Sequence, residues 1–232
     1  GVNEMQMKLA RKLTWGALIL GVVVWAGPAM AAGPVDVEVG ALYWVHDLEL
    51  EMGESAEYSA DAPALFGEVW INKLGFAADW YQSDVDEPDV GEAEVDYKSL
   101  DARWKILEVP GGNFLAIGAG MQQIDLSGDG ESFDSTGFRL VADAKLGLGR
   151  IVYAFGEVAI WTGLDDFEGN EVLLEDPSGH EIEVGLSVKP APFFNIKAGY
   201  RTSTLEYDVE GMGAEWAGDG FFGGVSFNFW RR

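Results

Sequence analysis

The feature that most constrains the fold is a two-residue alternation of apolar and charged side chains, which recurs from about residue 35 onward. Within residues 138–146, Phe138 and every second residue after it are apolar, whereas Arg139 and Asp143 are among the residues between them. Residues 181–189 and 194–201 alternate in the same way. Successive side chains of a β-strand point to opposite faces, so this pattern indicates strands with one apolar and one charged face.

The alternation divides the chain into ten segments whose lengths suit tilted strands that cross a bilayer and project beyond it. The segments are residues 35–47, 63–72, 74–84, 94–107, 113–125, 135–147, 150–163, 179–189, 193–206 and 216–230. We therefore expect an all-β protein, an antiparallel up-and-down transmembrane β-barrel of ten strands, with eight strands as the alternative.

The expected connections are alternately short and long, and the charge follows the same division. Tight turns are expected at Asn72–Lys73, Val109–Gly112, Leu148–Gly149 and Lys189–Pro192. The longer loops are residues 47–61, 84–96, 125–134, 165–176 and 206–215, which together hold 27 acidic side chains and neither Lys nor Arg. Outer-membrane barrels place short turns in the periplasm and long loops outside, so the acidic loops are expected to be extracellular.

The first 31 residues have the three parts of a secretory signal peptide. Lys8, Arg11 and Lys12 form a basic start, an apolar run follows, and Ala29-Met30-Ala31 provides the small residues of a cleavage site. The apolar run is too short to span a bilayer as a helix. We expect export through the general secretory pathway, cleavage after Ala31, and a single outer-membrane barrel domain over residues 32–232.

The charge balance of the expected mature chain limits its partners. Without the three bases and one acid of residues 1–31, it has 38 acidic and 12 basic side chains. Such a surface repels nucleic acid and anionic lipid, and it favours divalent cations or basic ligands. The chain has no cysteine, which excludes disulfides, a thiol nucleophile and a thiolate metal site.

The charged strand faces are expected to point into the barrel and the apolar faces toward lipid. The alternative is a water-soluble lipocalin-like barrel or sandwich, in which the two faces would be reversed. Tight turns would bring Glu181 opposite Arg201 and Arg139 near Glu157. We expect a lumen filled by ion pairs and water rather than an open pore, because narrow barrels are filled by their side chains. The predicted network comprises Glu68, Asp79, Arg103, Arg139, Asp143, Lys145, Glu157, Glu181, Lys197 and Arg201.

With its alternating strands and its last segment, Phe221-Phe222-Gly223-Gly224-Val225-Ser226-Phe227-Asn228-Phe229, the chain resembles the small bacterial outer-membrane barrels of the OmpA, OmpX and OmpW types. The resemblance covers residues 35–230 and rests on pattern rather than on a diagnostic motif. It implies a Gram-negative envelope protein that is folded by the barrel-assembly machinery, with roles in surface binding, adhesion, envelope stability or narrow channels. Here two bases, Arg231 and Arg232, follow the aromatic residues at which such proteins usually end.

Three other groups of residues could carry chemistry, and each has a simpler structural explanation. His180 and Glu181 lie at the expected outer rim near loop acids, as in the omptin outer-membrane proteases, although the Asp-x-His pattern of that family is absent. Glu68 and Asp79 could form an acid–base pair, but a salt-bridged network with Arg103 explains them more simply. His46 is expected to be structural.

Residues 125–131 resemble a calcium loop in composition, with Asp125, Asp129 and Glu131 as candidate ligands for Ca²⁺ or Mg²⁺, but they lack the full spacing. No other cofactor is expected, and the barrel is expected to be a monomer in contact with lipopolysaccharide. We rank a structural or surface-interaction role first, a narrow porin-like channel for small solutes second and a rim hydrolase third, so the protein is predicted not to be an enzyme.

Overall fold

The computed structural model describes residues 35–51, 55–87, 91–128, 131–165, 167–168, 173–209 and 212–231. The predicted signal peptide and its cleavage site lie outside these residues. Among the described residues no helix is long and apolar enough to cross a membrane.

The described chain is built of antiparallel strands. They are β1 (Val35–Glu51), β2 (Ser55–Ile71), β3 (Leu74–Glu87), β4 (Gly91–Val109), β5 (Asn113–Gly128), β6 (Glu131–Gly147), β7 (Val152–Thr162), β8 (Phe167–Glu168), β9 (Leu173–Ala191), β10 (Phe194–Val209) and β11 (Met212–Arg231). Each barrel strand pairs with its neighbour along the chain, and β11 pairs with β1, which closes the sheet. The short β8 pairs only with β9. The closed barrel of ten strands is therefore confirmed, and the alternative of eight strands is wrong.

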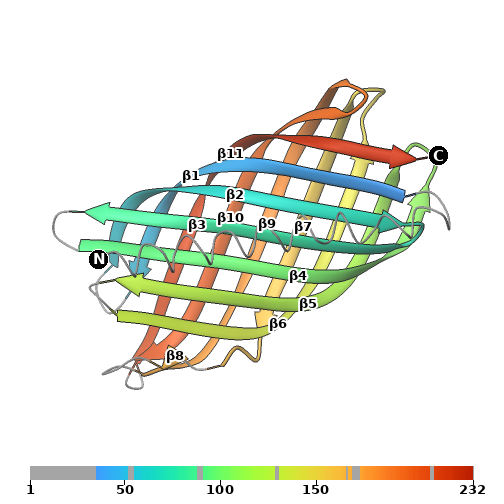
Figure 1. Ribbon diagram of the computed structural model, residues 1–232. Coiled ribbons are helices and arrows are strands. Elements are labelled where there is room, and N and C mark those ends of the chain that lie inside the picture. Colours follow the sequence, from blue (N-terminus) through green and yellow to red (C-terminus); the bar gives the residue numbers. More distant parts are fainter. Residues whose placement is uncertain are drawn as a thin grey trace, which may run out of the picture.

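The strands are strongly tilted, so that β2–β5 cross the steeper β7, β9 and β10 in projection (Figure 1). The tilt follows from the register. Hydrogen-bonded partners traced from Leu42 through β2, β3, β4 and β5 reach β6 at Ser135, whereas those traced through β11, β10, β9 and β7 reach Gly147, twelve residues away. A shear of this size for ten strands corresponds to a tilt within the usual range of about 35–45°.

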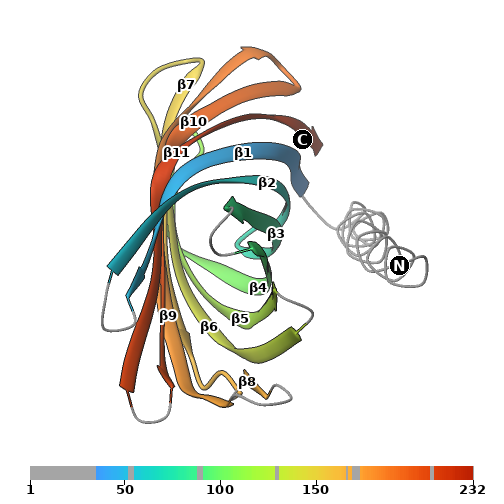
Figure 2. The same cartoon turned by 90° about the vertical axis from the view of Figure 1, so that its left-hand side faces the viewer.

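Connections at the two ends of the barrel differ as expected, but the described residues of the long ones form strands where loops were predicted. Tight turns follow β2, β4, β6 and β9; at one of them Asn72 has a φ of 57°, at another Gly111 has a φ of 96°. At the opposite end, most of the predicted loop residues extend the strands as two-stranded ribbons. Glu51, for example, is still in register with Ser55, and Gly128 with Glu131. Figure 2 shows these ribbons projecting beyond the body of the barrel.

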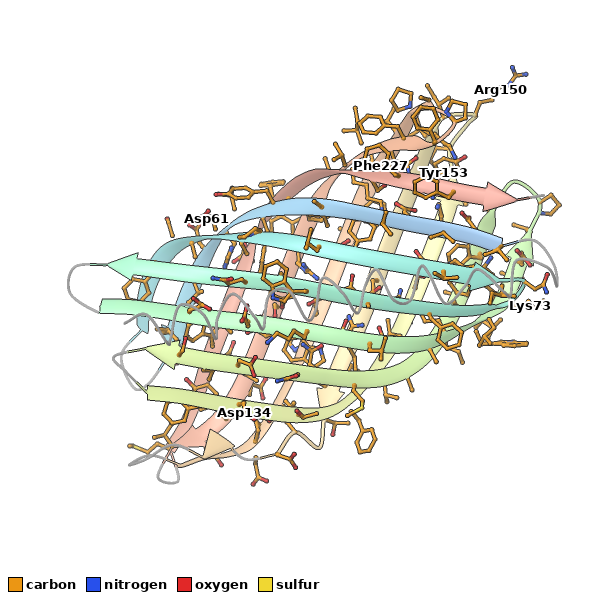
Figure 3. All side chains as sticks on the ribbon, viewed as in Figure 1. Asp61, Lys73, Asp134, Arg150, Tyr153 and Phe227 are labelled. Atoms are coloured by element: carbon orange, nitrogen blue, oxygen red, sulfur yellow. The ribbon has the colours of Figure 1, made fainter. Side chains whose placement is uncertain are left out.

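Figure 3 shows the same polarity in the charges, with Lys73 and Arg150 at the end that carries the tight turns and Asp61 and Asp134 toward the other end. The strand faces are as predicted. Leu140 and Phe138 are 53% and 68% exposed on the outer wall, whereas the intervening Arg139 is buried in the lumen. An apolar exterior around a charged interior fits a barrel surrounded by lipid, so the water-soluble alternative is wrong.

Candidate functional site

The candidate site is the lumen, and its half nearer the tight turns is filled by ion pairs. Arg139 lies at its centre, where it contacts Asp101, Glu157 at 2.6 Å and Glu181 at 3.6 Å. Arg103 lies beside it and contacts the same Asp101 at 3.0 Å and the same Glu157 at 2.8 Å. Two guanidinium groups thus share two carboxylates. This bridged arrangement compensates charges that would be costly to bury singly.

The network continues on both sides of this centre. Arg201 contacts Glu181 at 2.9 Å and Glu183 at 3.6 Å. Toward the tight turns, Glu38 receives the Lys197 ammonium at 2.6 Å and lies 3.9 Å from that of Lys145. The Glu38 carboxylate also accepts hydrogen bonds from the side chains of Ser226 and Asn228, at 2.7 and 3.2 Å, so its two oxygens are satisfied from β10, β11 and β6.

The predicted pairs of Arg139 with Glu157 and of Arg201 with Glu181 are both present, although neither pair is directly opposite in the sheet. The residue opposite Arg201 is Glu183, and the residue opposite Arg139 is Trp161. The long arginine side chains therefore reach along the barrel to a carboxylate on the neighbouring strand.

The predicted network of Arg103 with Glu68 and Asp79 is wrong in its contacts, because Arg103 binds Asp101, Asp143 and Glu157 instead. The register explains the difference, since Asp79 lies opposite Ser99 and Arg103 lies opposite Gly75. The Ser99 hydroxyl donates to Asp79 at 3.2 Å, and the Trp70 indole donates to Glu68.

Glu68 and Asp79 line a lumen cavity of about 90 Å³ together with Asp143, Glu183 and Arg201. One water occupies about 30 Å³ of the liquid, so this cavity has room for a few water molecules. It supports the prediction of a lumen that combines ion pairs with water. Asp101 and Glu183, which the predicted network does not include, belong to it as well.

The other half of the lumen, nearer the ribbons, is filled by aromatic and aliphatic side chains. We call this the aromatic layer; its buried members are Trp44, Ala62, Ala64, Tyr81, Val95, Tyr97, Ile124, Trp161, Leu164, Leu205 and Phe222. Tyr97 stacks on Tyr81 at 4.5 Å between ring centroids and contacts Trp161 at 5.6 Å, so the rings extend across the lumen from β3 to β7.

Glycines on neighbouring strands provide the space for these rings. Gly179 lies directly opposite Trp161, and a Cβ atom at Gly179 would come within 2.5 Å of the indole. A Cβ atom at Gly199 would likewise come within 2.6 Å of Phe222. Glycine in a strand interior commonly marks such a close approach. Sequence reasoning missed the aromatic layer, although these rings stand at the inward-facing positions.

Arg201 joins the two halves of the lumen. Its guanidinium lies 4.4 Å from the centroid of the Tyr81 ring while it pairs with Glu181. The Tyr81 hydroxyl in turn lies 3.3 Å from Glu181 and 3.4 Å from Ser203. The polar edge of the aromatic layer is thus hydrogen-bonded to the ion-pair network.

The two histidines lie on opposite faces of the barrel wall. His180 is exposed on the outer wall, whereas its neighbour Glu181 is buried in the lumen, so the two side chains point to opposite faces. His46 is buried, stacks on Trp44 at 3.8 Å and lies 3.1 Å from the Ser83 hydroxyl. The expected structural role of His46 agrees with these contacts.

The candidate calcium loop is only partly described. Asp129 lies outside the described residues, and the side chain of Glu131 is not among them. Asp125 lies on the same strand face as the exposed Met121 and forms an ion pair with Lys98. In the part of the chain that the structure describes, no three His, Asp or Glu side chains are grouped closely enough to hold a metal ion.

Comparisons with known proteins agree with the fold. No protein-family model matches the chain, and no curated protein is similar to it in sequence. Among solved structures, the outer membrane protease OmpT from Escherichia coli is similar with a TM-score of 0.51 at 12% identity, over 84% of this chain and 96% of that one. An outer membrane channel from Pseudomonas putida F1 has a TM-score of 0.48 at 10% identity, over 86% of this chain and 96% of that one.

Neisserial surface protein A has a TM-score of 0.44 at 16% identity, over 85% of this chain and 99% of that one. At these identities the likeness is one of fold. The closed ten-stranded barrel and its apolar exterior, with the same fold in OmpT, define an integral outer-membrane β-barrel with a charge-braced lumen.

Proposed function

We propose that this barrel is a closed envelope protein with a structural or surface-interaction role, and that it is not an enzyme. The observation that carries the proposal is the filling of the lumen along its length. Ion pairs bridge one half, and rings packed from β1, β3, β4 and β7 occupy the other. Side chains that contact one another across the lumen support a rigid barrel rather than one through which solutes pass.

The experiment is a conductance measurement on the refolded barrel in planar bilayers. A closed lumen gives no unitary current steps at either polarity, whereas reproducible steps of one size would contradict the structural role. A narrow conduit for small solutes is the second candidate, because the cavity of about 90 Å³ in the charged half would form part of its path. Steps that appear in wild-type protein would favour this second function.

The acidic ribbons are the proposed interaction surface. The sequences of the five connections hold 27 acidic and no basic side chains, and the described residues of these connections lie at one end of the barrel. At physiological salt the Debye length is about 8 Å, so neighbouring carboxylates repel one another. Ca²⁺ or Mg²⁺ bound among them would relieve this repulsion and bridge to phosphates of neighbouring lipopolysaccharide.

Divalent cations that bind the folded barrel but not the unfolded chain must stabilise the folded state. The gain is about 2.7 kcal/mol when the free cation concentration is a hundred times the dissociation constant. We therefore expect a higher melting temperature and slower proteolysis of the ribbons in millimolar calcium than in sodium of equal ionic strength. Equal effects of the two salts would show that only screening operates, and this part of the proposal would be dropped.

A further inference from the structure

An apolar groove lies on the lipid-facing wall across β4, β5, β6 and β7, near the end with the tight turns. Its volume is about 320 Å³. The floor is formed where the outward-facing side chains are small, at Ala144, Ala154 and Gly156, which occupy neighbouring positions on β6 and β7. Exposed leucines, among them Leu115 and Leu146, stand along its sides. The groove is therefore a depression in the outer wall with apolar sides.

The hairpin that forms the groove ends in a turn suited to the membrane surface. Leu148 and Ile151 in this turn are 58% and 53% exposed, and Arg150 lies between them. Large exposed apolar side chains at a turn fit insertion among lipid headgroups, and an arginine there extends its guanidinium toward the water. Figure 3 shows Arg150 projecting away from the end of the barrel.

The distance between groove and guanidinium suits a single lipid molecule. Leu146 and Ala154 each lie four residues from Arg150 along the hairpin. At about 3.3 Å per residue, the groove begins roughly 13 Å or less from the turn. An acyl chain in the groove would thus bring its own phosphate to the level of Arg150, and guanidinium binds phosphate well because its donors match the oxygens.

We propose that this groove is a binding site for one anionic glycerophospholipid of the periplasmic leaflet. An acyl chain lies on Ala144, Ala154 and Gly156, and the phosphate and anionic headgroup are held by Arg150. The site opens on the outer wall, although Phe114, Lys145, Phe155 and Gly156 line both the groove and the lumen cavity. Lipid binding there does not depend on the proposed function.

The test is native mass spectrometry of the refolded barrel released from mixed micelles that contain phosphatidylglycerol or phosphatidylethanolamine. Wild-type protein is expected to retain one phosphatidylglycerol in preference to phosphatidylethanolamine. The double variant Ala144→Leu/Ala154→Leu fills the groove and should lose retention of both lipids. Arg150→Gln should retain lipid but lose the preference for phosphatidylglycerol.

The matched control is Ala102→Leu/Ala119→Leu, which adds the same atoms at two exposed, paired alanines of the outer wall of β4 and β5. It should behave as wild type. Heat-modified gel mobility verifies folding of each variant, and Ala154→Val replaces the double variant should that fail to fold. Retention of lipid by the filled groove equal to the control, or an unchanged lipid preference in Arg150→Gln, would overturn the proposal.

Discussion

Both halves of the lumen are lined by inward-facing strand positions, but different kinds of side chains fill them. In the half near the tight turns, Arg103 and Arg139 share two carboxylates, one from β4 and one from β7. In the half near the ribbons, Tyr97 and Trp161 pack against one another with glycine opposite the indole. The comparison teaches that a narrow barrel can be closed by charge compensation or by ring packing. The charged half should therefore be destabilised by loss of an ion-pair partner, and the aromatic half by loss of side-chain volume.

The charged half should be the more sensitive to loss of one partner. Arg139→Leu removes the cation shared by Asp101, Glu157 and Glu181, and it leaves buried carboxylates uncompensated. Breaking a buried pair on one side costs about 3–5 kcal/mol. Urea unfolding in lipid vesicles measures the loss. Leu140→Ala, at the adjacent position on the lipid face, is the control and should have a small effect; a loss for Arg139→Leu no larger than that control would refute the network's importance.

The aromatic half should respond to volume rather than to charge. Trp161→Ala removes the largest fully buried side chain of the layer and should destabilise the barrel by about 3 kcal/mol through lost packing and the cavity that remains. Because no charge is uncovered, lowering the pH should change this loss less than it changes the loss for Arg139→Leu. Equal pH dependence of the two variants would mean that the halves are not chemically distinct.

The junction between the halves should contribute least. Tyr81→Phe keeps the ring against Arg201 but removes the hydroxyl near Glu181 and Ser203. A typical hydrogen bond contributes about 1 kcal/mol, so the unfolding free energy should fall by roughly that amount. Tyr97→Phe, in the same stack, provides a comparison for the loss of a tyrosine hydroxyl. If Tyr81→Phe lowered the unfolding free energy as much as Trp161→Ala does, the junction would contribute as much to closing the lumen as the aromatic layer, which would contradict this ranking.

Much of the fold could be predicted from the sequence because strand alternation is a local signal. Leu140 faces outward and Arg139 inward because they alternate along one strand. The even number of strands follows from the count of alternating segments. The ribbons beyond the membrane were predicted as loops because their acidic residues mask the alternation, although backbone pairing continues from Glu51 to Ser55. Charged side chains on a two-stranded ribbon do not prevent the backbone hydrogen bonds between its strands.

The site could be predicted only in part because its contacts depend on register. Alternation places Arg103 and Asp79 in the lumen, but the stagger of β3 against β4 decides that Ser99, not Arg103, lies opposite Asp79. The aromatic layer was missed for a different reason. Trp44 and Trp161 stand at inward positions, yet an apolar residue is expected to face lipid when only the strand pattern is considered. The glycine opposite Trp161 was a usable signal once the register was known.

The central claim is that the lumen is closed between the outer end and the charged half, and the absence of cysteine allows a direct measurement. Single variants Ser59→Cys, exposed on the outer ribbon, and Ser99→Cys, buried in the charged half, can be treated on intact cells with a small hydrophilic thiol reagent. The account predicts that Ser99→Cys remains unlabelled over the time in which Ser59→Cys is labelled completely. Labelling of both at similar rates would contradict a closed lumen.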